Sequence, residues 1–161
     1  MKNTRPLLVA IGIVALGLVG FALYLQHVKD MAPCPWCVIQ RYCFVGLAIV
    51  CFVLAALPKG GGRAGTFLAA LIALGGAGSA GWHVWIKAHP SVSCGIDPME
   101  TALNKIPPAE LLPFLFKADG FCTTPYPPVI GLDIPVWSLI WFAFFALALL
   151  WLSFRGAPRR A

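Results

Sequence analysis

Six cysteines are the residues of this sequence with the most specific chemistry: Cys34, Cys37, Cys43, Cys51, Cys94 and Cys122. Cys34 and Cys37 form a C-x-x-C pair, a spacing used by redox-active dithiols whose thiol pKa is depressed. A long apolar stretch follows Cys37, so we expect the pair to enter the first turn of a helix. The positive end of the helix dipole stabilises a thiolate at that position. The spacing therefore predicts thiol–disulfide exchange.

Other uses of the pair are less favoured by the residues around it. A c-type haem site requires C-x-x-C-H, but Val38 follows Cys37. A zinc site built from four cysteines is disfavoured because Cys94 and Cys122 are single and widely spaced, so we expect no metal. A structural disulfide remains an alternative: it fits an oxidising face of a membrane but does not explain the low-pKa setting.

Arg41 lies four residues after Cys37, one helical turn further along the same face. This spacing predicts a permanent cation near the Cys37 sulfur. An ionisable side chain inside an apolar stretch suggests function, although an arginine near the end of a span can also extend to the lipid headgroups. Cys43 and Cys51 fall deeper in the same stretch and are interpreted as small buried apolar side chains.

The elements that position these residues follow from the composition. The chain has 161 residues, of which 60% are hydrophobic and only 11% charged, so its apolar excess must face lipid. Four apolar stretches reach the roughly 20 residues that a membrane-crossing helix needs: 6–26, 38–57, 66–86 and 134–154. We therefore expect an all-α, four-helix transmembrane bundle in one domain, 1–161. The scattered basic residues give no support for nucleic-acid binding.

The distribution of charge predicts how the bundle is oriented. Seven basic residues lie at the same ends of the four stretches: Lys2, Arg5, Lys59, Arg63, Arg155, Arg159 and Arg160. All six acidic residues lie on the other side. Because short cytoplasmic segments collect Lys and Arg, both termini are expected in the cytoplasm and loops 27–37 and 87–133 in the periplasm. The first stretch is too long and lacks a cleavage motif for a signal peptide.

The second outer loop is long and rich in proline, which excludes one continuous helix. Within it, residues Ala109–Ala118 are apolar with charged edges and predict a short helix lying in the membrane interface. A second unusual segment, residues 75–81 of the third stretch, consists of small side chains. These either allow close helix packing or leave room for a flat ring, and spacing alone does not decide.

The topology predicts two dithiols on one face of the membrane, one at the surface and one in a long loop. Oxidising equivalents pass between such pairs through mixed disulfides. The membrane-face pair needs an electron acceptor, and the sequence contains no haem, flavin or nucleotide motif. A lipid-soluble quinone is the acceptor that matches this location.

The chain resembles the disulfide bond formation protein B (DsbB) family over almost its whole length. The resemblance is carried by the four apolar stretches, CPWCVIQR at 34–41, the two later cysteines, and GLDIPVW at 131–137. It implies an enzyme of the bacterial inner membrane that reoxidises a periplasmic DsbA-like protein with a thioredoxin fold. The electrons are then expected to pass to ubiquinone or menaquinone.

The resemblance also implies a role for each of four cysteines. The reduced partner attacks a Cys94–Cys122 disulfide, with Cys94 forming the mixed disulfide. Cys34 then pairs with Cys94 in an intermediate between the two loops, which frees Cys37 as a thiolate beside the quinone.

Arg41 matches the family arginine that supports quinone binding. His83 matches a position near the quinone in some members, although a histidine near the end of a span is unremarkable. Two other functions stay open. One is a quinone reductase similar to vitamin K epoxide reductase, whose C-x-x-C pair lies on a later span. The other is a small structural membrane protein with two stabilising disulfides.

Overall fold

Four long helices form the bundle in the computed structural model, which describes residues 4–57, 61–89, 91 and 96–155. They are α1 (Arg5–Val28), α2 (Pro35–Ala56), α3 (Gly62–Ala88) and α7 (Ile134–Arg155). Each is long and apolar enough to cross a membrane. The predicted all-α class and the four spans are confirmed, and no helix end differs from its predicted position by more than four residues.

The start of α2 is set by the proline inside the C-x-x-C pair. Pro35 occupies the first helical position, where its missing N–H costs nothing and its fixed φ suits the helix. The residue before a proline avoids the helical region, and Cys34 accordingly has extended backbone angles (φ −77°, ψ 166°). Cys34 is therefore the N-cap and Cys37 lies in the first turn, as the sequence predicts.

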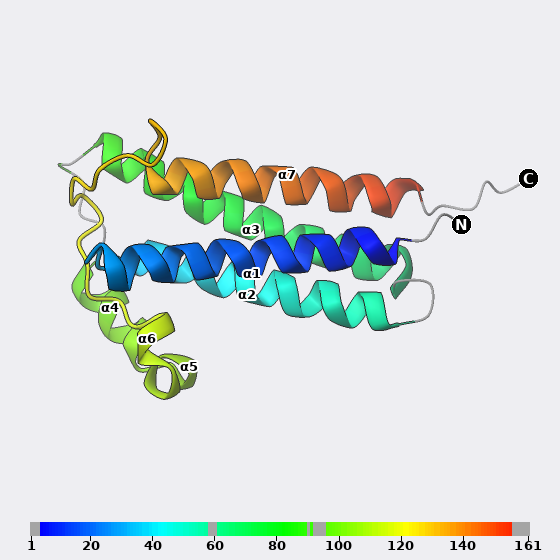
Figure 1. Ribbon diagram of the computed structural model, residues 1–161, viewed down its shortest axis with the longest axis horizontal. Coiled ribbons are helices and arrows are strands. Elements are labelled where there is room, and N and C mark those ends of the chain that lie inside the picture. The colour runs from blue at the N-terminus through cyan, green and yellow to red at the C-terminus, as the bar shows by residue number, and fades with distance from the viewer. Residues whose placement is uncertain (1–3, 58–60, 90, 92–95, 156–161) are drawn as a thin grey trace, which may run out of the picture.

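The four long helices pack in succession: α1 against α2, α2 against α3, and α3 against α7 (Figure 1). Across the core, the rings of Phe44 and Phe142 stack with centroids 3.9 Å apart. A Cβ atom at Gly76 would collide with the ring of Phe142. At Gly76, the small residues of α3 therefore allow close packing of the helices. This is the first of the two alternatives that the sequence left open.

Both outer loops lie at the same end of the bundle. Figure 1 shows the ends of α1 and α3 beside the beginnings of α2 and α7, with the beginning of α1 and the end of α7 at the opposite end. The part of the second loop that the structure describes carries three short helices, α4 (Ile96–Asn104), α5 (Pro107–Leu111) and α6 (Pro113–Phe116). The loops that carry the candidate cysteines can therefore meet.

The single helix predicted over Ala109–Ala118 is wrong, because the segment is divided between α5 and α6. The break falls at Pro113, which has no N–H to donate and disfavours helical angles in the residue before it. Leu112 accordingly lies outside the helical region (φ −129°, ψ 61°). Leu111 and Phe114 stay exposed on these short helices.

Backbone hydrogen bonds fix the second outer loop to the first. The N–H groups of Asp119 and Gly120 both donate to the Pro33 carbonyl, at 3.1 and 3.0 Å. The Tyr126 hydroxyl donates to the Ala32 carbonyl at 3.2 Å. The segment on either side of Cys122 is thus attached directly to the segment that precedes the C-x-x-C pair.

Candidate redox site

Three thiols meet where the outer loops join the bundle. The sulfurs of Cys34 and Cys37 are 3.5 Å apart. Cys122 packs with Cys34 and Ile86 in one buried cluster, where the two cysteines are 3% and 2% exposed. All three are free thiols in this structure. Cys94, the fourth predicted redox cysteine, lies outside the described residues, so its predicted pairing with Cys34 is not tested.

His83 reaches this cluster from α3. Its Nε2 lies 3.6 Å from the Cys34 sulfur and its Nδ1 lies 4.0 Å from the Cys37 sulfur. The Nε2 amide nitrogen of Gln40 lies 3.4 Å from the same Nδ1. With only 2% of its surface exposed, the imidazole is enclosed among these groups. The sequence placed His83 at the end of a span, but it did not predict contact with both thiols.

The surroundings of Cys34 disfavour its thiolate. A hydrogen-bonding interaction with Cys122, followed by burial, raises the pKa of Cys34 to about 12, against an opposing effect of Cys37. The prediction of a depressed pKa is therefore wrong for Cys34 in this dithiol state. The helix dipole lowers the pKa of a thiol only where the opposite effect of burial is small. Cys34 is almost fully buried, so burial outweighs the dipole.

This shift predicts how reduced Cys34 reacts with a small alkylating reagent. The thiolate is the nucleophile, so alkylation should be slow at neutral pH and rise about tenfold per pH unit up to a midpoint near 12. Replacing Cys122 with alanine should lower that midpoint, because it removes the largest cause. Mass spectrometry after timed alkylation at several pH values measures both. A midpoint below 9 in the parent would contradict the assignment.

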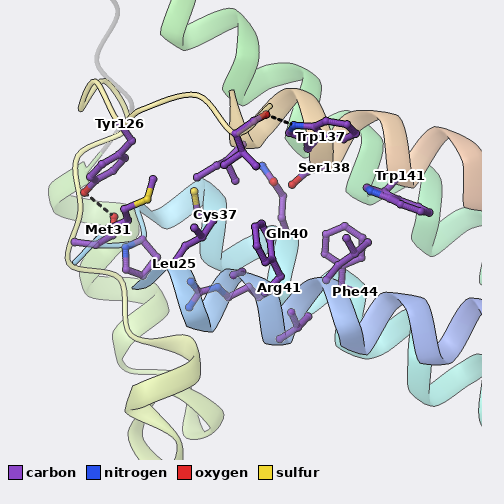
Figure 2. A pocket seen from close by; sticks show the side chains of 18 of the residues that line it. Leu25, Met31, Cys37, Gln40, Arg41, Phe44, Tyr126, Trp137, Ser138 and Trp141 are labelled. Atoms are coloured by element: carbon purple, nitrogen blue, oxygen red, sulfur yellow. Dashed lines mark hydrogen bonds between the residues drawn. The ribbon is translucent and has the colours of Figure 1, made fainter. Parts of the chain in front are cut away.

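A larger cavity lies on the other side of Cys37. It has a volume of about 310 Å³ and is lined by α1, α2, α7 and the two outer loops. Figure 2 shows Cys37, Gln40 and Arg41 on α2, with Trp137 and Trp141 on α7. The wall is mainly apolar and aromatic, with a few polar groups, as in sites that bind flat organic molecules.

A second, smaller pocket of about 40 Å³ adjoins this cavity, and Cys37 lines both spaces. The smaller pocket is also lined by Cys34, His83 and Cys122. Cys37 therefore has one side toward the other thiols and one side toward an apolar cavity within the bundle. Such an arrangement permits a single sulfur to react with both thiols and an apolar acceptor.

The similarity of this chain to known proteins identifies its family. The family model described as "Disulfide bond formation protein DsbB" matches residues 4–152. The chain belongs to the DsbB family. A relative named disulfide bond formation protein B from Herminiimonas arsenicoxydans is 59% identical, over 96% of this chain and 98% of its own length. A protein of the same name from Ralstonia nicotianae is 48% identical over 91% and 92%, respectively.

Membership of the DsbB family implies a disulfide-forming oxidoreductase that crosses the membrane several times. It favours the thiol oxidase over the two alternatives, the reductase similar to vitamin K epoxide reductase and the structural protein. Cys43 and Cys51 take no part in either space: Cys51 is fully buried in the apolar core and Cys43 packs against it. The interpretation as a buried apolar side chain is confirmed for Cys51, whereas Cys43 is only half-buried.

Arg41 lines the larger cavity of this DsbB-family protein and also forms a hydrogen bond with the second outer loop. One of its guanidinium nitrogens, Nη1, donates to the Gln26 side-chain oxygen at 2.6 Å and to the Leu115 carbonyl at 2.9 Å. The side chain is only 6% exposed, so it does not extend to the membrane surface in the way the alternative proposed. Arg41 joins α1, α2 and α6 at the edge of the cavity.

The sequence interpretation missed Gln40, which lines the cavity and contacts His83. A signal for it was available, because a polar amide inside an apolar span needs a partner. The aromatic cavity wall had no comparable signal. Trp137 and Trp141 resemble ordinary residues of a membrane helix until the fold places α7 across the cavity from α2.

Proposed function

We propose that this protein oxidises the dithiol of a periplasmic, DsbA-like protein with a thioredoxin fold and passes the electrons to a membrane quinone. The observation that carries the proposal is the position of Cys37, which lines both the thiol pocket and the apolar cavity. Two thiols that become a disulfide release two electrons and two protons. The pathway must therefore join a water-accessible dithiol to an acceptor that dissolves in lipid.

The loop geometry supports a change in the predicted relay. When the partner forms a mixed disulfide with Cys94, the sulfur released from a Cys94–Cys122 disulfide is that of Cys122. Cys122 packs against Cys34. We therefore assign the attack on Cys34 to Cys122, in place of the predicted pairing of Cys34 with Cys94. That attack forms a Cys34–Cys122 disulfide and releases Cys37 as a thiolate.

The larger cavity has the size and chemistry expected for a quinone headgroup. Its volume of about 310 Å³ lies within the usual range of small-molecule sites, and its aromatic wall suits a flat ring. Arg41, Gln40 and Ser138 are the polar groups available for the carbonyl oxygens. A bound quinone would supply an acceptor for two electrons and two protons. The apolar lining disfavours water, and Cys37, which belongs to that lining, would stand beside the acceptor.

His83 is proposed as a positioning group for the thiols. It lies against both sulfurs and outside the described lining of the larger cavity, so its predicted contact with the quinone is replaced by contact with Cys34 and Cys37. A neutral imidazole has one donor and one acceptor nitrogen, so it can exchange a proton with either sulfur during disulfide transfer.

The proposed location is the bacterial inner membrane with both termini in the cytoplasm and both outer loops in the periplasm. The positive-inside distribution of Lys and Arg supports this orientation. The common position of the two loops at one end of the bundle agrees with it (Figure 1). The short helices α5 and α6, with Leu111 and Phe114 exposed, are proposed to lie in the headgroup region.

The function is tested with the purified protein in detergent under anaerobic conditions. The quinone absorption should be recorded before and after addition of a reduced thioredoxin-fold dithiol protein. We expect one quinol for each partner disulfide formed. A partner that stays reduced, with no change in quinone absorption, would contradict the proposal and favour a structural role for the cysteines.

Replacing Arg41 with alanine should raise the KM for quinone about 10- to 100-fold, because a hydrogen bond from a charged donor contributes roughly 1.5–3 kcal/mol and 1.4 kcal/mol is a factor of about ten. Formation of the mixed disulfide at Cys94 should persist. Arg63→Ala is the matched control, because Arg63 lies near the opposite end of the bundle over the Phe154 ring. An unchanged KM for quinone in R41A would refute the role assigned to Arg41.

A further inference from the structure

The described residues bring together a set of metal-ligating groups that cysteine spacing did not predict. Cys34, Cys37 and His83 each offer one ligand atom, and these atoms lie within 4.8 Å of one another. Cys122 belongs to the same buried cluster as Cys34. We propose that the reduced protein binds one thiophilic cation of the Zn²⁺ or Cd²⁺ type through Cys34, Cys37, His83 and Cys122, and that this cation arrests the enzyme.

Two of the distances between the ligand atoms are close to the edges of a tetrahedral centre, and Cys122 packs beside Cys34 as the fourth group. With Zn–S bonds of about 2.3 Å and Zn–N bonds of about 2.0–2.1 Å, tetrahedral edges are about 3.8 Å between sulfurs and about 3.5 Å between sulfur and nitrogen. The Cys34 and Cys37 sulfurs are 3.5 Å apart, and the Cys34 sulfur lies 3.6 Å from His83 Nε2. Two edges of the tetrahedron therefore require only small adjustments.

The same groups surround a space that a cation can enter. Cys34, Cys37, His83 and Cys122 all line the smaller pocket of about 40 Å³. About 10–15 Å³ of such space holds one water molecule, so the pocket has room for a small ion with some of its water. Asp133 also lines it and forms an ion pair with Lys87 at 2.9 Å. This ion pair gives the pocket a polar edge.

Gln40 supplies the outer partner that a metal-bound histidine normally has. A ligating imidazole usually donates its other N–H to a carbonyl or carboxylate, which fixes the ring. The amide of Gln40 lies 3.4 Å from His83 Nδ1. Rotation of that amide by half a turn presents its oxygen to Nδ1–H and leaves Nε2 free for the cation.

The oxidation state of the site controls binding. Thiolates are the ligands, so each bound thiol gives up its proton and no electrons are transferred. A Cys34–Cys37 disulfide has no thiolate to offer. The cation is therefore expected to bind only the reduced enzyme and to prevent its reoxidation, because it holds the sulfur that must reach the acceptor.

The test uses the full chain in detergent, reduced and under anaerobic conditions, without quinone or partner protein. Cd²⁺ titration should give a thiolate-to-Cd²⁺ absorption band that saturates at one ion per chain, and Zn²⁺ should displace it. The chain oxidised at Cys34–Cys37 should show no band. Since no turnover is measured, failure here is distinguishable from failure of the proposed quinone reaction.

Variants separate the four-ligand site from simple chelation by two thiols. His83→Ala and Cys122→Ser should each weaken Cd²⁺ binding at least about tenfold, and Gln40→Leu by about 10- to 100-fold. Cys51→Ser, a matched cysteine in the apolar core, should bind as the parent does. Circular dichroism confirms that each variant is folded. Equal affinity in folded H83A and parent, or equal binding by the oxidised chain, would overturn the proposal.

Discussion

Replacing Cys37 with serine is expected to abolish quinone reduction, with a fall in rate of roughly a thousandfold or more. Among the described sulfurs, that of Cys37 lines both the thiol pocket and the apolar cavity. A serine hydroxyl keeps the size of the side chain but cannot form a disulfide. The variant therefore loses the step that connects the two spaces while the bundle around it is preserved. Anaerobic quinol formation from reduced partner protein measures the loss.

Cys43→Ser is the matched control for this experiment. Cys43 lies on the same helix but packs against the apolar core and lines neither space. Its variant should form quinol at nearly the parent rate. In C37S, Cys34 has no disulfide partner for Cys122 to attack, so mass spectrometry should still detect the mixed disulfide between the partner and Cys94 while no quinol forms. Quinol production by C37S at the parent rate would eliminate Cys37 from the pathway.

The sequence predicted the bundle well because lipid imposes a simple rule. Every backbone group in the hydrocarbon region must be bonded within the segment, so length and hydropathy define the helices almost completely. The C-x-x-C pair was also placed correctly, since Pro35 fixes where α2 begins. These features depend on residues that are neighbours in the chain.

The features that sequence did not predict depend on contacts between distant segments. Cys122 reaches Cys34 because two backbone N–H groups, those of Asp119 and Gly120, donate to the Pro33 carbonyl, and backbone donors leave no residue-type signal. His83 reaches the thiols only through the packing of α3 beside α2. The raised pKa of Cys34 follows from that same convergence, which outweighs the local effect of the helix end.

Gly120→Ala tests whether loop docking is required for disulfide transfer. A Cβ atom at Gly120 would collide with the Ala32 carbonyl oxygen, which belongs to the backbone and cannot move aside as a flexible side chain would. Overpacking of this kind costs roughly 1–3 kcal/mol. Since 1.4 kcal/mol is a factor of about ten, the docked loop should become about 5- to 150-fold less populated relative to the undocked loop. Partner-dependent quinol formation should fall accordingly.

The effect should be confined to transfer between the loops. A small dithiol that reduces Cys34–Cys37 directly bypasses Cys122, so the quinol formation it drives should remain close to that of the parent in G120A. Gly78→Ala is the matched control, because a Cβ atom there meets nothing within 4 Å. It should leave both reactions unchanged. If G120A slowed both reactions equally, the glycine would support the whole bundle, and docking of the loop would not be the step that brings Cys122 to Cys34.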